Sequence, residues 1–255
     1  MIKLIIFIVI SITTFNSVNA RKTGETEITT EDGIEVFQEE KYYLLKKNVE
    51  IVSDELELQA QIVKIHFEDD LYDIKDLDAK TDVSFVSDAF NIKGSGNNVK
   101  FNVKDQIIMI NGENSELYLE TTQMFSDGKI NVNNLEGSFI INGPNSILIS
   151  DNIYISGYII NGEFKIINEK RDISNLIVED KIKLNIKTQD TIMFSKKAIF
   201  NKEKSIIELF EEVEINRGGE IITGDYGILD TKKNSYKVSS NKSKKVKAII
   251  SSSNE

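Results

Sequence analysis

The chain has 255 residues, with 31 lysines and arginines against 41 aspartates and glutamates, and a formal net charge of −10. A nucleic-acid-binding protein needs a basic face to neutralise phosphates, so the acidic balance argues against that class. The absence of cysteine excludes disulfides, thiolate metal sites and cysteine nucleophiles. The single histidine, His66, excludes a metal site built from several histidines.

The first twenty residues predict a signal peptide. Lys3 precedes an apolar run from Leu4 to Ile12, and Val18 and Ala20 match the small residues that signal peptidase requires before a cleavage site at Arg21. The run is shorter than the roughly 20 apolar residues that span a bilayer comfortably. An exported chain without cysteine suits a bacterial periplasm, so we expect residues 1–20 to be removed there. Retention of the same segment as an inner-membrane anchor is the alternative.

The rest of the chain predicts many short strands, because apolar and polar residues alternate over short runs and no long stretch has helical spacing. The expected strands are Val49–Ile51, Leu56–Phe67, Val99–Ile110, Glu116–Thr121, Phe139–Ile141, Ser146–Ile149, Ile153–Ile155, Ile206–Ile215 and Glu220–Asp230. Six dipeptides favour tight hairpin turns between them: Asp32-Gly33, Asn111-Gly112, Asp127-Gly128, Asn142-Gly143, Asn161-Gly162 and Gly218-Gly219. No linker composition marks a boundary, so we expect one domain over 21–250 and a short polar tail at 251–255.

The alternation also predicts one apolar face. The apolar positions are even from Leu56 to Ile62 and then change parity to Val63 and Ile65, which indicates a bulge or kink within the strand. An apolar sheet face must be covered, either by another sheet of the same chain or by a lipid.

A weak internal repeat has an offset of 164 residues. It places Val49 on Val213 and Ile51 on Ile215, each followed by a second strand of matching parity. Repetition of one hairpin unit builds an extended stack of strands.

The C-terminal stretch carries the most specific resemblance. It reads A-I-F-N from Ala198, V-E-I-N-R-G from Val213, I-T-G-D-Y from Ile222 and Y-K-V-S-S from Tyr236. This stretch resembles the recurring hairpin unit of the LptA/OstA-like family of periplasmic lipopolysaccharide export proteins. Gly33–Val36 and Lys47–Ala60 resemble the first unit of that family. The family's usual glycine before Val49 is replaced by Asn48, and the region 130–175 departs from the family pattern.

The resemblance implies an all-β fold, a half-open elongated β-jellyroll of many short antiparallel strands, whose apolar interior holds lipopolysaccharide acyl chains. It also implies head-to-tail self-association and joining to the jellyroll domains of an inner-membrane, LptC-like component and an outer-membrane, LptD-like component. No catalytic residue, metal or cofactor is implied. The residues predicted to line the trough share parity within their strands: Val49, Ile51, Leu56, Leu58, Ile207, Leu209, Val213, Ile215 and Ile222.

Other functions fit the sequence less well. We expect His66 to point outward, Glu68-Asp69-Asp70 lacks the spacing of a calcium loop, and no pair of carboxylates stands out as a glycosidase pair. We therefore do not expect an enzyme. The alternatives to a lipid-carrying periplasmic bridge are a membrane-anchored LptC-like component, which would keep residues 1–20, and a non-transport β-solenoid adhesin or polysaccharide-binding protein. A solenoid should show a regular short period, whereas the spacing here is irregular.

Overall fold

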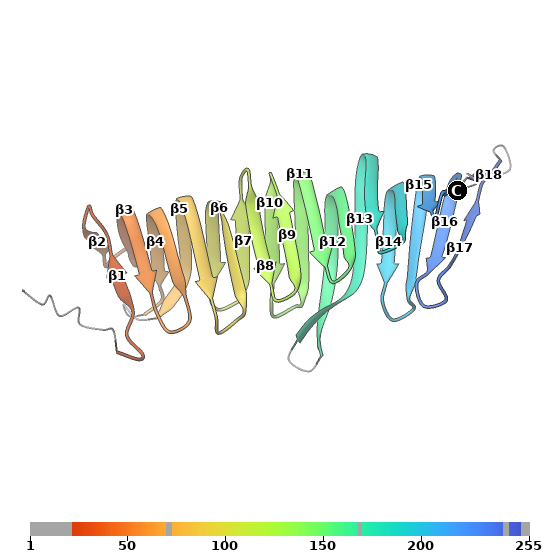
Figure 1. Cartoon of the computed structure of the whole chain (residues 1–255). Helices are drawn as coiled ribbons and strands as arrows, with labels where there is room; N and C mark the ends of the chain where they lie inside the picture. The colour runs from red at the N-terminus through yellow and green to blue at the C-terminus, as the bar shows by residue number, and fades with distance from the viewer. Residues whose placement is uncertain (1–21, 70–72, 168–169, 242–244, 251–255) are drawn as a thin grey trace, which may run out of the picture.

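The computed structural model describes residues 22–69, 73–167, 170–241 and 245–250. The predicted signal peptide and the polar tail lie outside these ranges. Within them every regular element is a β-strand paired antiparallel with its neighbours, which confirms the all-β prediction (Figure 1). The strands are β1 (Glu27–Thr29), β2 (Ile34–Phe37), β3 (Tyr42–Val52), β4 (Glu57–Phe67), β5 (Ile74–Ser87), β6 (Ile92–Asn102), β7 (Ile107–Asn111), β8 (Ser115–Leu119), β9 (Thr122–Ser126), β10 (Lys129–Asn133), β11 (Ser138–Ser150), β12 (Ile153–Ile167), β13 (Lys170–Lys187), β14 (Thr191–Asn201), β15 (Ile206–Arg217), β16 (Glu220–Asp230), β17 (Ser235–Ser239) and β18 (Lys247–Ile250).

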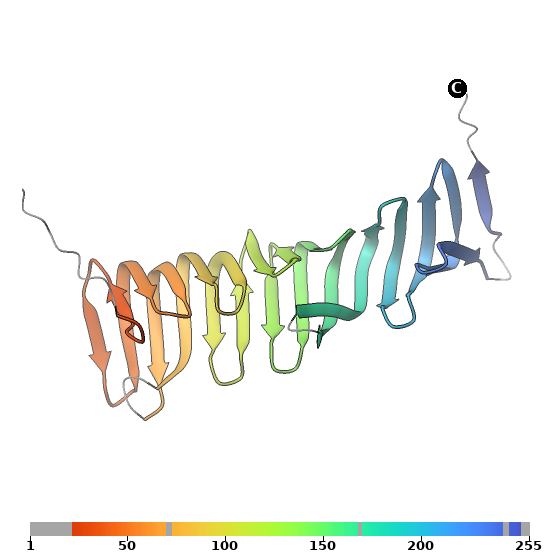
Figure 2. The same ribbon diagram turned by 60° about the horizontal axis from the view of Figure 1, so that its bottom comes forward.

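The sheet is folded lengthwise into two leaves that meet at a crease. Each long strand crosses the crease near its middle, so its two halves belong to different leaves. Leaf 1 contains β2, β7, β10, β17 and the halves 42–46, 62–67, 74–80, 98–102, 138–142, 159–167, 170–179, 197–201, 206–210 and 226–230. Leaf 2 contains β1, β8, β9, β18 and the remaining halves. This is the predicted half-open, elongated β-jellyroll, with β1 and β2 at one end and β17 and β18 at the other (Figures 1 and 2).

At the crease the strand pairing shifts register, and several strands carry extra residues there in a left-handed backbone. Lys47 and Asn48 have φ values of 68° and 48°, and the pairing of β3 with β4 shifts register beside them, between Lys46 and Val49. On β4 the next shift lies between Gln59 and Ile62, where the apolar parity changes. A bulge of this kind bends a strand and increases its twist. The predicted kink in this strand is therefore confirmed.

Most of the predicted hairpin turns are wrong, because only Gly218-Gly219 joins two strands of one leaf. Asp32-Gly33, Asn111-Gly112, Asp127-Gly128 and Asn142-Gly143 lie at the crease, where the chain passes from one leaf to the other. The positive φ that these dipeptides favour is used there, for example at Gly143 with φ 132°. Asn161-Gly162 lies inside β12 instead.

Gly162 is required for space rather than for a turn. It pairs with Phe139 on β11, whose ring covers it, and a Cβ at position 162 would lie 2.1 Å from Phe139 Cζ. A glycine under an aromatic ring of the neighbouring strand is a known way to fill the gap that a missing side chain leaves in a sheet.

The expected strand Val99–Ile110 is also wrong, because a turn at 103–106 divides it into β6 and β7. The side chain of Asn102 accepts a hydrogen bond from Asp105 N at 2.8 Å, which forms the turn without glycine. The same hydrogen bond, from the backbone N three residues later to a side-chain oxygen, forms other turns of leaf 1 at Asn133, Asn201 and Asp230. The expected strand Glu116–Thr121 ends earlier, at Leu119, where β8 turns into β9.

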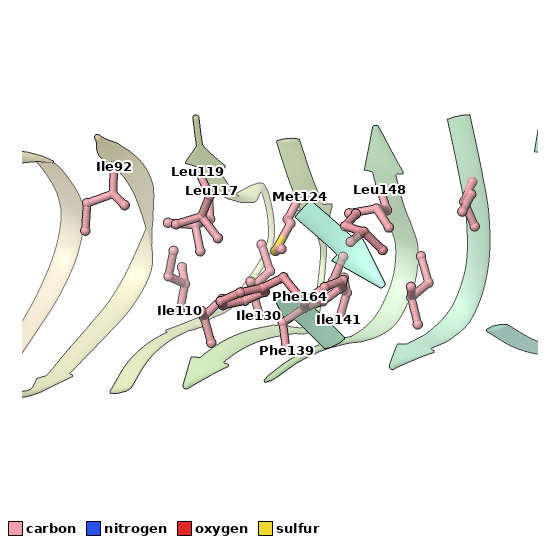
Figure 3. Close-up of a cluster of buried hydrophobic side chains, with 14 of the residues drawn as sticks. Ile92, Ile110, Leu117, Leu119, Met124, Ile130, Phe139, Ile141, Leu148 and Phe164 are labelled. Carbon is pink, nitrogen blue, oxygen red and sulfur yellow. The ribbon is translucent and has the colours of Figure 1, made fainter. Parts of the chain in front are cut away.

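The core lies between the two leaves. Figure 3 shows Leu117, Leu119, Met124 and Leu148 of leaf 2 facing Ile110, Ile130, Phe139 and Ile141 of leaf 1, and all of them are buried. Further along, the rings of Phe85 on leaf 2 and Phe101 on leaf 1 meet edge to face with centroids 4.9 Å apart. The apolar face predicted from the alternation is thus covered mainly by the other leaf of the same chain.

Candidate functional site

The two leaves leave an opening, here called the mouth, along the side opposite the crease. The hairpin turns of leaf 1 form one lip of the mouth, and those of leaf 2 form the other. In the N-terminal half of the molecule the leaves separate at the mouth and leave a cavity of about 320 Å³ between them, here called cavity 1. This volume lies at the lower end of the range found for small-molecule sites.

The wall of cavity 1 is mainly apolar and comes from both leaves. Leaf 2 and its turns contribute Ile28, Ile51, Leu56, Phe90, Ile92 and Leu119, and leaf 1 and its turns contribute Ile65, Ile74, Leu77, Phe101, Val103, Ile107, Ile108 and Val132. Among the described lining residues, only Glu55 and Arg171 carry charge. A wall of this kind is suited to hydrocarbon, because each methylene removed from water contributes about 0.8 kcal/mol.

The predicted trough residues lie on the inner faces of both leaves. Seven of them are buried, with at most 5% of each residue exposed: Val49, Ile51, Leu58, Ile207, Leu209, Val213 and Ile215. Leu56 and Ile222 are only partly buried. Ile51 and Leu56 line cavity 1, whereas the other seven do not line either of the two cavities described here. Contact of these residues with a lipid stays a prediction.

The alternation pattern missed most of the wall of cavity 1, because many wall residues lie at strand ends or in turns. Phe90 and Val103 lie in turns, where large apolar side chains are uncommon because turns are exposed to water. They are 46% and 54% exposed. Apolar residues in turns next to amphipathic strands are the signal that could have located the mouth.

A second, smaller cavity of about 80 Å³, here called cavity 2, lies further toward the C-terminus. Leu148, Ile153 and Ile155 of leaf 2 face Ile173, Leu176 and Phe200 of leaf 1 across it. Between the two cavities lies the first part of β13, Lys170–Ser174, here called the strap. It belongs to the part of the β12–β13 hairpin that extends beyond the neighbouring strand ends (Figures 1 and 2).

Arg171 of the strap joins the lips of the mouth. Its Nη1 lies 2.9 Å from Glu120 Oε1 in a turn of leaf 2, and its own backbone N donates to Glu120 Oε2 at 3.1 Å. Nε and Nη2 both donate to Asn134 Oδ1 in a turn of leaf 1, at 3.0 and 2.8 Å. Nη1 also donates to the carbonyl oxygen of Phe90 in leaf 2 at 3.5 Å. The planar guanidinium suits such a junction, because it presents several donors in a fixed fork.

A second arginine joins the lips at the C-terminal end. Arg217 of leaf 2 lies 2.6 Å from Asp190 Oδ2 and donates to the carbonyl oxygen of Asn234 in a leaf 1 turn at 3.1 Å. Beside it, the hydroxyl of Tyr236 on leaf 1 donates to Glu220 on leaf 2, which raises the pKa of Tyr236. Both arginines of the described residues therefore connect one leaf to the other across the mouth.

His66 lies on the face of β4 opposite Ile65 and Phe67 and is only partly buried. Its ring meets Tyr42 edge to face at 5.9 Å between centroids. Partial burial and the neighbouring Lys64 lower the pKa of His66. In the described part of the chain, no group of three side chains suited to hold a metal ion occurs. The described ranges also contain no helix with the length and apolar character needed to cross a membrane.

No family model matches the chain, and no curated protein matches it. Among solved structures, one similar chain is LptH of Pseudomonas aeruginosa, described as the LptA homologous periplasmic component of the lipopolysaccharide transport device. The similarity covers 89% of this chain and 95% of that chain, at 7% identity and a TM-score of 0.23. At this TM-score the whole chains do not superpose, so the proposed function rests on the residues of this chain.

Proposed function

We propose that this protein is a periplasmic carrier of lipopolysaccharide, which holds the acyl chains of the lipid between its two leaves while the sugars stay in water. The observation that carries the proposal is cavity 1, an apolar space that opens along the side of an elongated double-leaved sheet. An enclosed cavity would have to take in the whole ligand. A side opening instead admits hydrocarbon chains and leaves a large polar group outside.

The energetics favour such a carrier. An acyl chain of about twelve carbons costs on the order of 10 kcal/mol when exposed to water, at about 0.8 kcal/mol for each methylene. An apolar trough removes most of that cost along the path between two membranes. It supplies no direction, so an energy source outside this chain must drive the movement. The predicted signal peptide and the resemblance of residues 198–240 to the hairpin unit of the LptA/OstA-like family support the same proposal.

Photo-crosslinking tests the lipid role. Phe101 lines cavity 1, whereas the neighbouring Lys100 is exposed, and its Nζ lies 3.2 Å from Asp78 Oδ2 within leaf 1. A photoreactive benzophenone derivative of phenylalanine at position 101 should label with lipopolysaccharide in cells, and the same group at position 100 should not. Equal labelling at both positions, in protein shown to be folded by circular dichroism, would contradict the proposal.

We further propose that copies of the protein join end to end, and join the jellyroll domains of LptC-like and LptD-like partners, through the terminal strands. In the described ranges, β2 pairs only with β3 and β18 pairs only with β16. Ile34 and Val36 on β2 are about half exposed, and Ile249 and Ile250 on β18 are 46% and 76% exposed. An apolar edge strand with free backbone groups is a template for strand addition.

Light scattering over a range of protein concentrations tests the assembly. The wild-type chain should grow into longer species as its concentration rises. Ile249→Lys or Val36→Lys should keep it monomeric, because lysine on an edge strand opposes pairing. Lysine at Ile140, an exposed position within β11, is the matched control and should leave assembly unchanged. Assembly that is insensitive to either edge variant would show that the ends do not mediate it.

A further inference from the structure

The strap lies between cavity 1 and cavity 2, and its consecutive residues line different cavities. Arg171 lines cavity 1, whereas Asp172 and Ile173 line cavity 2. Ile173 is buried, and the ring of Phe164, on the facing arm of the hairpin, stacks on Phe139 of leaf 1 at 6.2 Å between centroids. The strap is therefore packed into the trough as a partition.

The contacts of Arg171 are suited to hold this partition in place. Arg171 and Glu120 are each only 16% exposed, and theirs is the least exposed ion pair among the described residues. By comparison, Lys197 and Glu179 form a pair within leaf 1 whose side chains are 42% and 44% exposed. Partial removal from water strengthens an ion pair, provided that its remaining donors and acceptors are satisfied. Asn134 and the carbonyl of Phe90 accept three further hydrogen bonds from the guanidinium group.

Resting on the proposed lipid role, we propose that the strap is a gate in the trough and that Arg171 is the residue that holds it shut. With Arg171 bound to Glu120 and Asn134, the lips are joined and hydrocarbon in cavity 1 stops at the strap. When Arg171 releases either lip, the mouth widens at the strap and the chains can continue from cavity 1 into cavity 2. The gate divides the path into two steps, so a lipid waits in cavity 1 before it moves on.

The mechanical part of this proposal can be tested without lipid. The chain has no cysteine, so cysteines introduced at Thr121 and Glu136 would be the only ones to carry spin labels. Both side chains are exposed, and they flank Arg171 on the leaf 2 lip and the leaf 1 lip. Wild type should show one narrow distance distribution by pulsed electron resonance. Arg171→Gln and Glu120→Gln should each add a population with a longer distance between the labels. Arg171→Lys should add a smaller population of this kind, because lysine keeps the charge but lacks the planar fork of guanidinium donors. Lys197→Gln is the matched control and should resemble wild type.

Transfer between the cavities is tested by photo-crosslinking to lipopolysaccharide from position 101 in cavity 1 and from Ile153 in cavity 2. In the wild-type background labelling should be strong at 101 and weak at 153. Arg171→Gln should raise labelling at 153 by about fivefold, the factor that corresponds to roughly 1 kcal/mol, with labelling at 101 unchanged. Lys197→Gln should raise neither.

The outcomes separate the gate from the lipid role. Unchanged distances in Arg171→Gln, or labelling at 153 that is the same with and without Arg171, overturns the gate while labelling at 101 still supports a lipid carrier. A complete lack of labelling at 101 in every background overturns the carrier and lipid gating with it. Wider distances in Arg171→Gln would then still show that Arg171 holds the lips together.

Discussion

Asn48 and Glu212 lie 164 residues apart in the chain and have the same left-handed backbone, with φ values of 48° and 54°. Lys47 and Glu211, the residues before them, share it with φ values of 68° and 63°. In both places the chain crosses the crease, from leaf 1 to leaf 2, and Val49 and Val213 follow as buried residues. The weak sequence repeat thus corresponds to one structural unit, a strand that bends at the crease.

The first prediction concerns the same bend on β5. Thr81 is exposed and has φ 64°, although a β-branched residue is strained in this region. Thr81→Asn should therefore raise the free energy of unfolding by about 0.5–1 kcal/mol, since asparagine tolerates a left-handed backbone. Urea denaturation monitored by circular dichroism measures this. Thr81→Val keeps the branched side chain and should leave stability nearly unchanged. A stabilisation by Val equal to that by Asn would show that backbone strain is not the cause.

The bends explain which parts of the fold can be predicted from the sequence and which cannot. Alternation located strands such as β4, β15 and β16 and the change of parity after Ile62, because the inner face of each leaf is buried and side chains alternate along a strand. It did not identify others, such as β5 and β14. It could not tell a hairpin turn from the crease, since both use positive φ. Asn111-Gly112 is a crease dipeptide, while the turn at 103–106 is formed by Asn102 and has no glycine.

The candidate site was less predictable for a different reason. Cavity 1 is lined in part by turn residues of both lips, such as Phe90 and Val103, and its size depends on how far the two leaves separate. Arg171 reaches Glu120, which is 51 residues away in the sequence, and no periodic pattern connects them. Local alternation identifies the inner face of a strand, whereas the position of the opening depends on contacts between distant turns.

The second prediction concerns pH. Partial burial lowers the pKa of His66 from 6.5, so the unfolded chain binds a proton at this residue more readily than the folded protein does. The contribution of His66 to stability is therefore complete above about pH 6.5 and is lost as the pH falls toward its folded pKa. His66→Gln should make the free energy of unfolding less dependent on pH between 7 and 5. Urea titrations of both proteins at the two pH values measure the difference. An identical pH dependence would mean that His66 has the same pKa in both states.

The third prediction concerns alkaline pH. Tyr226 donates a hydrogen bond to Glu208 Oε1 at 2.6 Å, which raises the pKa of Tyr226 to about 12. The neutral hydroxyl is favoured in the folded protein, so its contribution to stability should fall as the pH rises above about 10, where tyrosine ionises in the unfolded chain. In a spectrophotometric titration of the folded protein, Tyr226→Phe should remove one tyrosinate from the alkaline end of the curve. Removal of an early-titrating tyrosine instead would contradict the assignment.

The last prediction separates the core between the leaves from the wall of the cavity. Ile215 is 1% exposed and pairs with Met193 and Ile222 on the neighbouring strands, so Ile215→Ala leaves a hole where the leaves pack. It should lower the free energy of unfolding by about 2–5 kcal/mol. Ile107 is only partly buried and lines cavity 1, so Ile107→Ala should lower the free energy of unfolding by less, about 1 kcal/mol, because one side of the residue already faces open space.

The affinity for an acyl chain should respond to these two substitutions in the opposite order. A fluorescent fatty acid titrated into the folded proteins should bind more weakly to Ile107→Ala and with unchanged affinity to Ile215→Ala. If weaker binding instead follows the loss of Ile215, the acyl chains lie deeper between the leaves than cavity 1, among the residues that alternation first indicated.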